Sequence, residues 1–265
     1  MKLILITGLD GSGKSTLISR LEAHKNEGTA FLRAPVINAE VFEENQKLYK
    51  ASLFINWLNT EADSLNVPQL KAAALFASML IFKDLLEEFR KKNVDLVFCE
   101  RHPLIDTAVY ARFYADKMHP KSIPVATLAE IDYNFNAELG YFTKMMNLKK
   151  QDMPHGALHA LLLLMYNWFY IHKKFALEHL KELFSVEMPS KIYYLKADAD
   201  VLFQRIAQRD VLEPHETEKV LAKFIPVYDQ VLADAKTETE VVNANEVKHL
   251  DGAYHQIRKN YFPAL

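Results

Sequence analysis

The sequence predicts an α/β fold in which a five-stranded parallel sheet is covered by helices. Five short β-prone runs alternate with segments of helical periodicity, a glycine-rich loop directly follows the first run, and charged residues follow the third. Strands separated by helices form parallel sheets, because a parallel crossover needs about a dozen residues or more. The chain has 265 residues, of which 50% are hydrophobic, enough to bury one large core. We therefore expect a single domain, 1–265, with an extra helical segment at about 119–189.

The predicted strands are runs rich in Val, Ile, Leu, Phe and Tyr: Lys2–Thr7, Thr29–Arg33, Val94–Cys99, Lys191–Leu195 and Glu240–Asn243. Apolar residues at helical spacing predict the helices. The first follows the glycine-rich loop, and further helices are expected over Gln69–Lys92 and over 104–118. Two long helices are expected within 126–184, one between the fourth strand and about Arg209, and the last two over Val220–Ala235 and Val247–Tyr261. The segment from Pro35 to about residue 66 is polar and aromatic, and 213–219 is expected to be a loop.

Charge and cysteine content exclude several classes of protein. The net charge is −2, with 32 basic and 34 acidic residues, so no excess of positive charge indicates a nucleic acid polymer as partner. The lone cysteine, Cys99, excludes an internal disulfide and is expected to be a buried small side chain. The first strand begins at Lys2, and the later apolar stretch at 157–170 is short and carries polar residues. We therefore expect a cytoplasmic protein without signal peptide or membrane span.

The glycine-rich loop predicts a nucleoside triphosphate site. Residues Gly8 to Ser15 match the pattern G-x-x-x-x-G-K-[ST], in which backbone N–H groups surround phosphates, the Lys14 ammonium reaches their oxygens, and the Ser15 hydroxyl ligates Mg²⁺. The helix that begins near Thr16 directs its N-terminal partial positive charge at the same anion. The expected contacts to the nucleotide come from Gly8, Asp10, Gly11, Ser12, Gly13, Lys14, Ser15 and Thr16.

Three segments resemble known kinase families. The loop Gly-Leu-Asp-Gly-Ser-Gly-Lys-Ser-Thr resembles that of thymidylate kinases, which carry Asp at the position of Asp10. The segment Phe98–Pro103 resembles the Glu-Arg or Asp-Arg element of deoxynucleoside kinases, and its form in herpesviral thymidine kinases is the most similar. The strand at 194–197 and the Arg-x-x-x-Arg pattern within 202–209 look like the approach to the lid in both groups. The resemblance covers about 1–112 and 190–260.

The resemblance implies ATP and Mg²⁺ as cofactors and assigns roles to several residues. Glu100 faces the phosphates through Mg²⁺ or water, and Arg101 clamps their oxygens. Arg205 and Arg209, four residues apart, close over the triphosphate, and Asn243 lies near the adenine. The expected catalytic groups are Asp10, Lys14, Glu100, Arg101 and Arg209, and the expected metal ligands are Ser15 and Glu100.

The chain departs from these families at three places. Ala34 in Arg33-Ala34-Pro35 occupies the position of the glutamate that acts as base in deoxynucleoside kinases, and Val211 stands where their lid carries a further arginine. The stretch Phe76–Leu80 lacks the arginine with which thymidylate kinases hold the substrate monophosphate. A strong base is not mandatory when the transition state is loose, so Asp10 or Glu100 is the hypothetical proton acceptor.

The acceptor is expected to be a small nucleoside or nucleotide. Tyr49, Phe54 and Trp57 would offer aromatic faces to its base; the alternative is that they fill a core. The apolar helices of 126–184 are interpreted as core or as the interface of a homodimer, by analogy with related kinases.

The leading hypothesis is therefore an ATP-dependent kinase of a nucleoside or nucleoside monophosphate. The alternatives are a nucleotide-binding regulatory protein with reduced catalysis and a kinase of another small alcohol or phosphate ester. A regulatory GTPase is disfavoured because the sequence has no Asn-Lys-x-Asp element.

Overall fold

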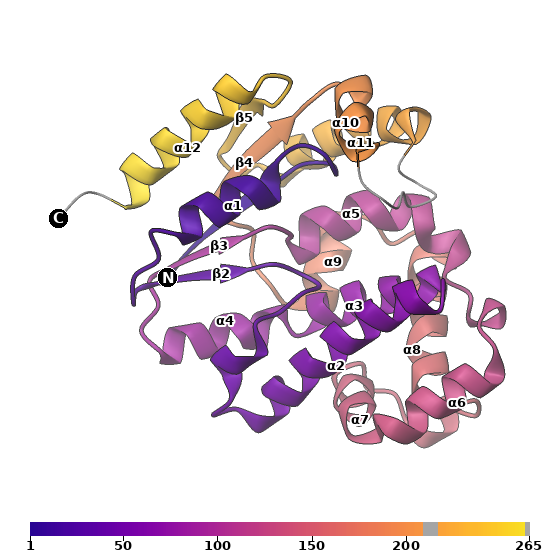
Figure 1. The fold of residues 1–265 in the computed structure, drawn as a ribbon. Coiled ribbons are helices and arrows are strands. Elements are labelled where there is room, and N and C mark those ends of the chain that lie inside the picture. The colour runs from indigo at the N-terminus through magenta and orange to yellow at the C-terminus, as the bar shows by residue number, and fades with distance from the viewer. Residues whose placement is uncertain (209–216, 263–265) are drawn as a thin grey trace. The chain divides into compact units, whose positions relative to one another are not determined.

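The computed structural model describes residues 1–208 and 217–262, and these divide into two compact units (Figure 1). The sheet unit comprises Met1–Leu32, Phe89–Ile105 and the described part of Glu187–Leu265. The helical unit comprises Arg33–Glu88 and Asp106–Val186. The predicted extra segment at 119–189 lies almost wholly within the helical unit, together with chain on both sides of the third strand.

The sheet unit holds the predicted sheet. Its strands are all parallel in the described chain, in the order β2-β3-β1-β4-β5. Their bounds are β1 Lys2–Thr7, β2 Thr29–Leu32, β3 Leu96–Cys99, β4 Lys191–Lys196 and β5 Thr239–Asn243. The prediction of a five-stranded parallel sheet is confirmed. Because β1 is central and its neighbours connect in opposite directions, the loop after β1 lies at the point where α/β sheets place ligands.

Both faces of this sheet are covered, as the side-chain alternation along β4 demonstrates. The Tyr194 ring stacks on Tyr228 of α11 with centroids 5.4 Å apart, and the Tyr228 hydroxyl lies 2.9 Å from the Thr7 hydroxyl. The neighbouring Tyr193 faces the other side, where burial and the nearby Tyr261 of α12 raise its pKa to about 12. Such two-sided burial is why the strands read as continuous apolar runs.

The helices of the sheet unit in the described residues are α1 Lys14–Glu22, α10 Ala199–Ile206, α11 Glu218–Ala235 and α12 Val247–Tyr261. The first and last of these pack against each other, and the Arg20 guanidinium lies 4.0 Å from the centre of the Tyr254 ring. Beyond α12, the Phe262 ring stacks on Phe98 of β3 at 5.7 Å. The last helix is thereby fixed against α1 and the sheet.

The helical unit contains α2 Gln46–Ser64, α3 Pro68–Leu80, most of α4 Phe82–Lys91, most of α5 Pro103–Tyr114, α6 Val125–Asn134, α7 Asn136–Met145, α8 Ala157–Tyr166 and α9 Leu177–Phe184. Short 3₁₀ turns occupy Ala39–Phe42, Ala115–Lys117, Pro120–Ser122 and Lys150–Asp152, and a π-helical turn occupies Asn167–Ile171. No helix within 1–208 and 217–262 has the length and apolarity needed to cross a bilayer.

The helix prediction was wrong in three places within this unit. Four α-helices stand where two long ones were expected in 126–184, the expected helix Gln69–Lys92 is interrupted at Ile81, and α2 was missed. Phe135 separates α6 from α7 with φ −124° and ψ 32°, and its ring packs 4.3 Å from Trp57. Ile81, which is fully buried, has ψ near −1°. Tertiary packing therefore overrides the helical periodicity at both breaks.

Candidate functional site

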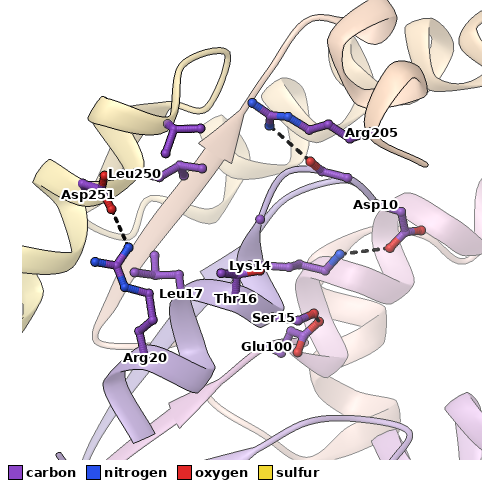
Figure 2. Close-up of a pocket in the computed structure, with 13 residues that line it drawn as sticks. Asp10, Lys14, Ser15, Thr16, Leu17, Arg20, Glu100, Arg205, Leu250 and Asp251 are labelled. Carbon is purple, nitrogen blue, oxygen red and sulfur yellow. Dashed lines mark hydrogen bonds and ion pairs between the residues drawn. The ribbon is translucent and has the colours of Figure 1, made fainter. Parts of the chain in front are cut away.

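A pocket of about 430 Å³ opens at the carboxyl end of β1 in the sheet unit (Figure 2). Its walls come from the glycine-rich loop, α1, the residue after β3, α10 and α12. The lining residues are Asp10, Gly11, Gly13, Lys14, Ser15, Thr16, Leu17, Arg20, Glu100, Arg205, Val247, Leu250 and Asp251. Eight of the residues predicted from the sequence are therefore brought together.

Two glycines of the loop are required by its geometry. A Cβ at Gly8 would lie 2.5 Å from the carbonyl oxygen of Leu195, so only glycine allows the loop to leave β1 beside β4. Gly13 is the N-cap of α1 and has φ 93°, in the left-handed region, which glycine adopts without steric cost. Its carbonyl accepts the first helical hydrogen bond, from Leu17 N–H at 3.0 Å. The N-terminus of α1 thereby lines the pocket, where its partial positive charge favours an anion.

The Lys14 ammonium is held against its own loop. Its Nζ lies 2.9 Å from Asp10 Oδ1 and donates to the Leu9 carbonyl at 3.5 Å. The Arg101 Nη2 lies 3.7 Å from the same Asp10 oxygen. The Lys14 side chain is 6% exposed and that of Arg101 16%, so both charges lie where water screens them weakly. Asp10 thus organises two cations beside the loop.

Ser15 and Glu100 form the contact between the loop and the end of β3. The Ser15 hydroxyl donates a hydrogen bond of 2.8 Å to Glu100 Oε1, joining residues 85 positions apart in sequence. A hydroxyl and a carboxylate oxygen are the hard ligands that Mg²⁺ takes together with phosphate oxygens and water. In the described residues no group of three or more His, Cys, Asp or Glu side chains could hold a metal ion. The pair therefore fits a metal that arrives with a phosphate rather than a cage built from protein alone.

Arg205 of α10 connects the loop to the chain after β5. Its Nη1 donates to the Gly11 carbonyl at 3.2 Å and its Nη2 to the Asn245 carbonyl at 3.1 Å. Figure 2 shows this side chain reaching over the loop. Arg205 lines the pocket while its guanidinium holds two backbone segments in place. Arg209, together with Val211, lies outside the described residues.

The segment after β5 is closed by asparagine hydrogen bonds. Asn243 Oδ1 accepts the N–H of Asn245 at 3.0 Å, and the Asn245 side chain exchanges two hydrogen bonds with Asp198, of 2.8 and 3.0 Å. Asn243 does not line the pocket. The sequence-based expectation that it approaches an adenine stays a prediction.

Five lining residues were not predicted from the sequence: Leu17, Arg20, Val247, Leu250 and Asp251. Arg20 Nη1 lies 2.5 Å from Asp251 Oδ1, a bridge between α1 and α12. Positions 13, 17 and 20 lie on one face of α1. The helical spacing after the glycine-rich loop therefore could have predicted that Leu17 and Arg20 line the pocket. The α12 residues had no local signal, because only the packing of α12 on α1 brings them here.

Other predicted or considered residues lie outside the pocket. Ser12 is completely buried, and Gly8 is packed against Leu195. His102, which follows Arg101, is also buried, and burial lowers its pKa to about 3; its Nδ1 accepts the Leu104 N–H at 3.3 Å at the start of α5. Cys99 is completely buried, as expected. His102 is therefore a neutral core residue at physiological pH.

The aromatic residues considered for base stacking lie in the helical unit. Phe54 is 2% exposed, and its ring lies 4.9 Å from Phe135 and 6.1 Å from Phe142. Trp57, which packs on the same Phe135, and Tyr49 are both half-buried. For Phe54 the structure supports the alternative interpretation, an intramolecular core.

Comparison with known proteins gives a family and two similar structures. Residues 3–143 match the family described as the AAA domain. Deoxyadenosine kinase from M. mycoides with products dCMP and a flexible dCDP bound is 17% identical, with 97% of this chain and 99% of that chain covered and a TM-score of 0.45. The same kinase with bound dATP is 14% identical, with 97% and 100% covered and a TM-score of 0.46. No curated protein matches the sequence.

The family match covers more than half of the chain and begins inside β1. It includes Glu100 and the complete phosphate loop, five residues of which line the pocket together with Glu100. The chain therefore belongs to the AAA domain family.

Proposed function

We propose that the protein is an ATP- and Mg²⁺-dependent phosphotransferase whose acceptor is a nucleoside or a nucleoside monophosphate. The observation that carries this proposal is the hydrogen bond between Ser15 and Glu100, beside Lys14, at the open end of the phosphate loop. A loop that only holds a structural turn has no need of a carboxylate from a distant strand next to its serine. Phosphoryl transfer, by contrast, depends on positioning the phosphates and neutralising their charge.

Each group at the pocket has a part in that reaction. The backbone N–H groups of the loop and the N-terminus of α1 bind the β- and γ-phosphates. Lys14 leaves Asp10 for a phosphate oxygen, and Arg101 then neutralises Asp10 or clamps the transferred group. Arg205 holds Gly11 in position. Mg²⁺, held by Ser15 and Glu100, would neutralise charge on the phosphate oxygens.

The proton of the acceptor hydroxyl requires a base late in the reaction. Ala34 stands where related kinases have a carboxylate, so Asp10 and Glu100, which line the pocket beside Lys14 and Ser15, are our candidates for this role. Asp10→Asn and Glu100→Gln each keep the shape of the side chain and remove its basicity. We expect at least one of them to slow a single turnover by about a hundredfold or more. A loss of only a few-fold in both would disprove the assignment of the base.

The experiment that tests the function is incubation of the protein with labelled ATP, Mg²⁺ and a panel of nucleosides and nucleoside monophosphates. Transfer of label to one acceptor supports the proposal and identifies the substrate. Tight ATP binding without transfer to any acceptor would support the second candidate, a nucleotide-binding regulatory protein, which Ala34 favours. Absence of ATP binding would exclude both.

The deoxyadenosine kinase named above binds dCMP, dCDP and dATP, so the deoxynucleosides and their monophosphates belong in this panel. The cytoplasmic location and the homodimer inferred from the sequence stay predictions. Light scattering of the purified chain tests the dimer directly.

A further inference from the structure

A second hollow lies within the helical unit, between α2 and α7, which pack against each other. It has a volume of about 660 Å³ and is lined by Gln46, Lys47, Lys50, Ala137, Glu138, Gly140, Tyr141, Lys144 and Met145. Pockets that bind small molecules are typically about 300–1,000 Å³ in volume and commonly lie between helices. None of these residues was predicted to form a site, and none takes part in the proposed phosphotransfer.

The groove carries an excess of positive charge. Lys47 and Lys50 on α2 and Lys144 on α7 are exposed, and within the described residues none of them has an ion pair. The lining includes one carboxylate, that of Glu138. Lys47 and Lys50 are three positions apart, so they lie on the same face of α2, where like charges repel. An anion in the groove would relieve this repulsion.

The rest of the lining is mainly apolar. Tyr141 presents a ring whose orientation is fixed, because its hydroxyl donates a hydrogen bond to Asp84 of α4. Met145 and Ala137 add apolar surface beside it. A ring thus held offers a flat face on which an aromatic group can stack, and the neighbouring Gln46 amide carries both donors and an acceptor. Inorganic phosphate alone would leave this surface exposed.

Gly140 opens the groove toward the backbone of α7. It lies in the interior of that helix, where glycine is destabilising relative to alanine, and a Cβ built on it would meet no heavy atom within 4 Å. No protein neighbour therefore requires glycine at this position. The absent side chain instead leaves room for a ligand to approach the helix closely.

We propose that the groove between α2 and α7 binds a nucleoside triphosphate, with its phosphates on Lys47, Lys50 and Lys144 and its base against Tyr141 and Met145. Lysine binds phosphate as a point charge, and burying the base against the ring and the thioether adds affinity by removing apolar surface from water. This site is separate from the phosphate loop and does not depend on the phosphotransferase activity.

Binding at the groove is measured in Lys14→Ala protein, in which the phosphate loop no longer competes for the probe. The probes are dATP, dCTP, dGTP and dTTP, each titrated by calorimetry. We expect one equivalent of at least one of them to bind, and the additional changes Lys47→Gln, Lys50→Gln and Lys144→Gln to weaken it by about a hundredfold or more. Lys150→Gln, an exposed lysine of the same unit, is the matched control and leaves the affinity unchanged.

A steric test locates the ligand independently of charge. Gly140→Phe places a ring in the groove without meeting protein atoms at its Cβ, so we expect folding to be retained and binding to be lost. Gly252→Phe is its control and retains binding, because Gly252 lies in α12 of the sheet unit, where an added Cβ also meets no heavy atom within 4 Å. Unchanged binding in folded Gly140→Phe protein, or no binding of any of the four triphosphates to Lys14→Ala protein, would overturn the proposal.

The final comparison separates the phosphates from the base. Inorganic tripolyphosphate and an uncharged nucleoside are each expected to bind at least about tenfold more weakly than the triphosphate, because each lacks one half of the recognised chemistry. Tripolyphosphate binding as tightly as the nucleotide would mean a site for bare anions and would contradict the proposal. If the phosphate loop itself fails to bind ATP in the unmodified protein, the proposed function fails while the groove remains testable by the same titrations.

Discussion

Lys14 in the sheet unit and two hydroxyls in the helical unit are polar groups buried in different ways. In the sheet unit, Lys14 is buried at the start of α1, and Lys14 and its neighbours surround an open pocket. In the helical unit the buried Ser78 and Thr143 hydroxyls donate back to carbonyls of their own helices, those of Leu75 and Gly140. Polar groups of the first kind are arranged around a space, whereas those of the second kind satisfy the backbone. Burial of a polar group therefore indicates a site only where the group faces a cavity.

The largest expected effect concerns the stability of the helical unit. Phe54→Ala removes a ring that packs on Phe135 and Phe142, and we expect the free energy of unfolding to fall by about 3–5 kcal/mol. Because Phe54 does not line the phosphate-loop pocket, the affinity for ATP below the unfolding transition should change little. Denaturant unfolding and ATP titration measure the two effects.

Tyr133→Ala is the control for this change. Tyr133 is 87% exposed, so its removal should alter the free energy of unfolding by less than about 0.5 kcal/mol. Equal decreases in the free energy of unfolding of the two variants would mean that the packing of Phe54 on Phe135 and Phe142 does not form the core of the unit.

The next largest effect concerns the sheet unit. Lys14→Ala removes the ammonium that Asp10 holds beside the loop, and we expect phosphotransfer to fall by about 10²–10³-fold, as when one preorganised donor to a transition state is lost. Fold stability should change far less than it does in Phe54→Ala. Lys25→Ala, an exposed lysine of the same unit, is the control, and a comparable loss of activity there would contradict a specific role for Lys14.

The two units also differ in how far the sequence predicted them. All five strands of the sheet unit were placed within two residues of their observed bounds. For β1 to β4 the reason is that strands buried on both faces have apolar sequences. β5 is largely unburied, and its adjacent valines were the signal there. The phosphate loop was recognisable for a similar reason: Gly11 and Gly13 have φ angles of 83° and 93°, which the turn of the loop itself requires. Local requirements leave a local signal.

The parts that were missed depend on packing between distant segments. In α2, Asn45 caps the helix by accepting the Leu48 N–H at 3.3 Å, and buried residues recur at 48, 51, 55, 58 and 62; this periodicity was present but was obscured by the aromatic residues among them. The break at Phe135 depends on a cluster with Trp57, which no local pattern reveals. In the site, Asp251 meets Arg20 because α12 packs on α1.

Burial of His102 in the sheet unit should make the free energy of unfolding depend on pH. His102 has a pKa of about 3 in the folded protein because burial disfavours its charged form, against about 6.5 when unfolded. Above pH 6.5 the imidazole is neutral in both states. As the pH falls from 6.5 toward 3 only the unfolded state gains the proton, so stability is lost across that window, by about 2 kcal/mol between pH 7.5 and pH 5.

Denaturant unfolding at these two pH values measures the loss. His102→Gln should remove this part of the pH dependence, whereas His172→Gln, which changes an exposed histidine of the helical unit, should retain it. The same slope in the unmodified protein and in His102→Gln would show that other groups are responsible.

The smallest expected effect is the change in stability when a helix glycine in each unit is replaced by alanine. It tests whether either glycine is needed for folding. Gly252 in α12 and Gly140 in α7 both lie in helix interiors, and a Cβ at either would meet no heavy atom within 4 Å. Each change to alanine should therefore raise the free energy of unfolding by about 0.5–1 kcal/mol. If both rise equally, neither glycine is needed for folding, and the one that lines a groove is retained at a cost in stability. A fall in Gly140→Ala alone would mean instead that α7 needs glycine for its own structure, which would remove the steric argument for a ligand beside it.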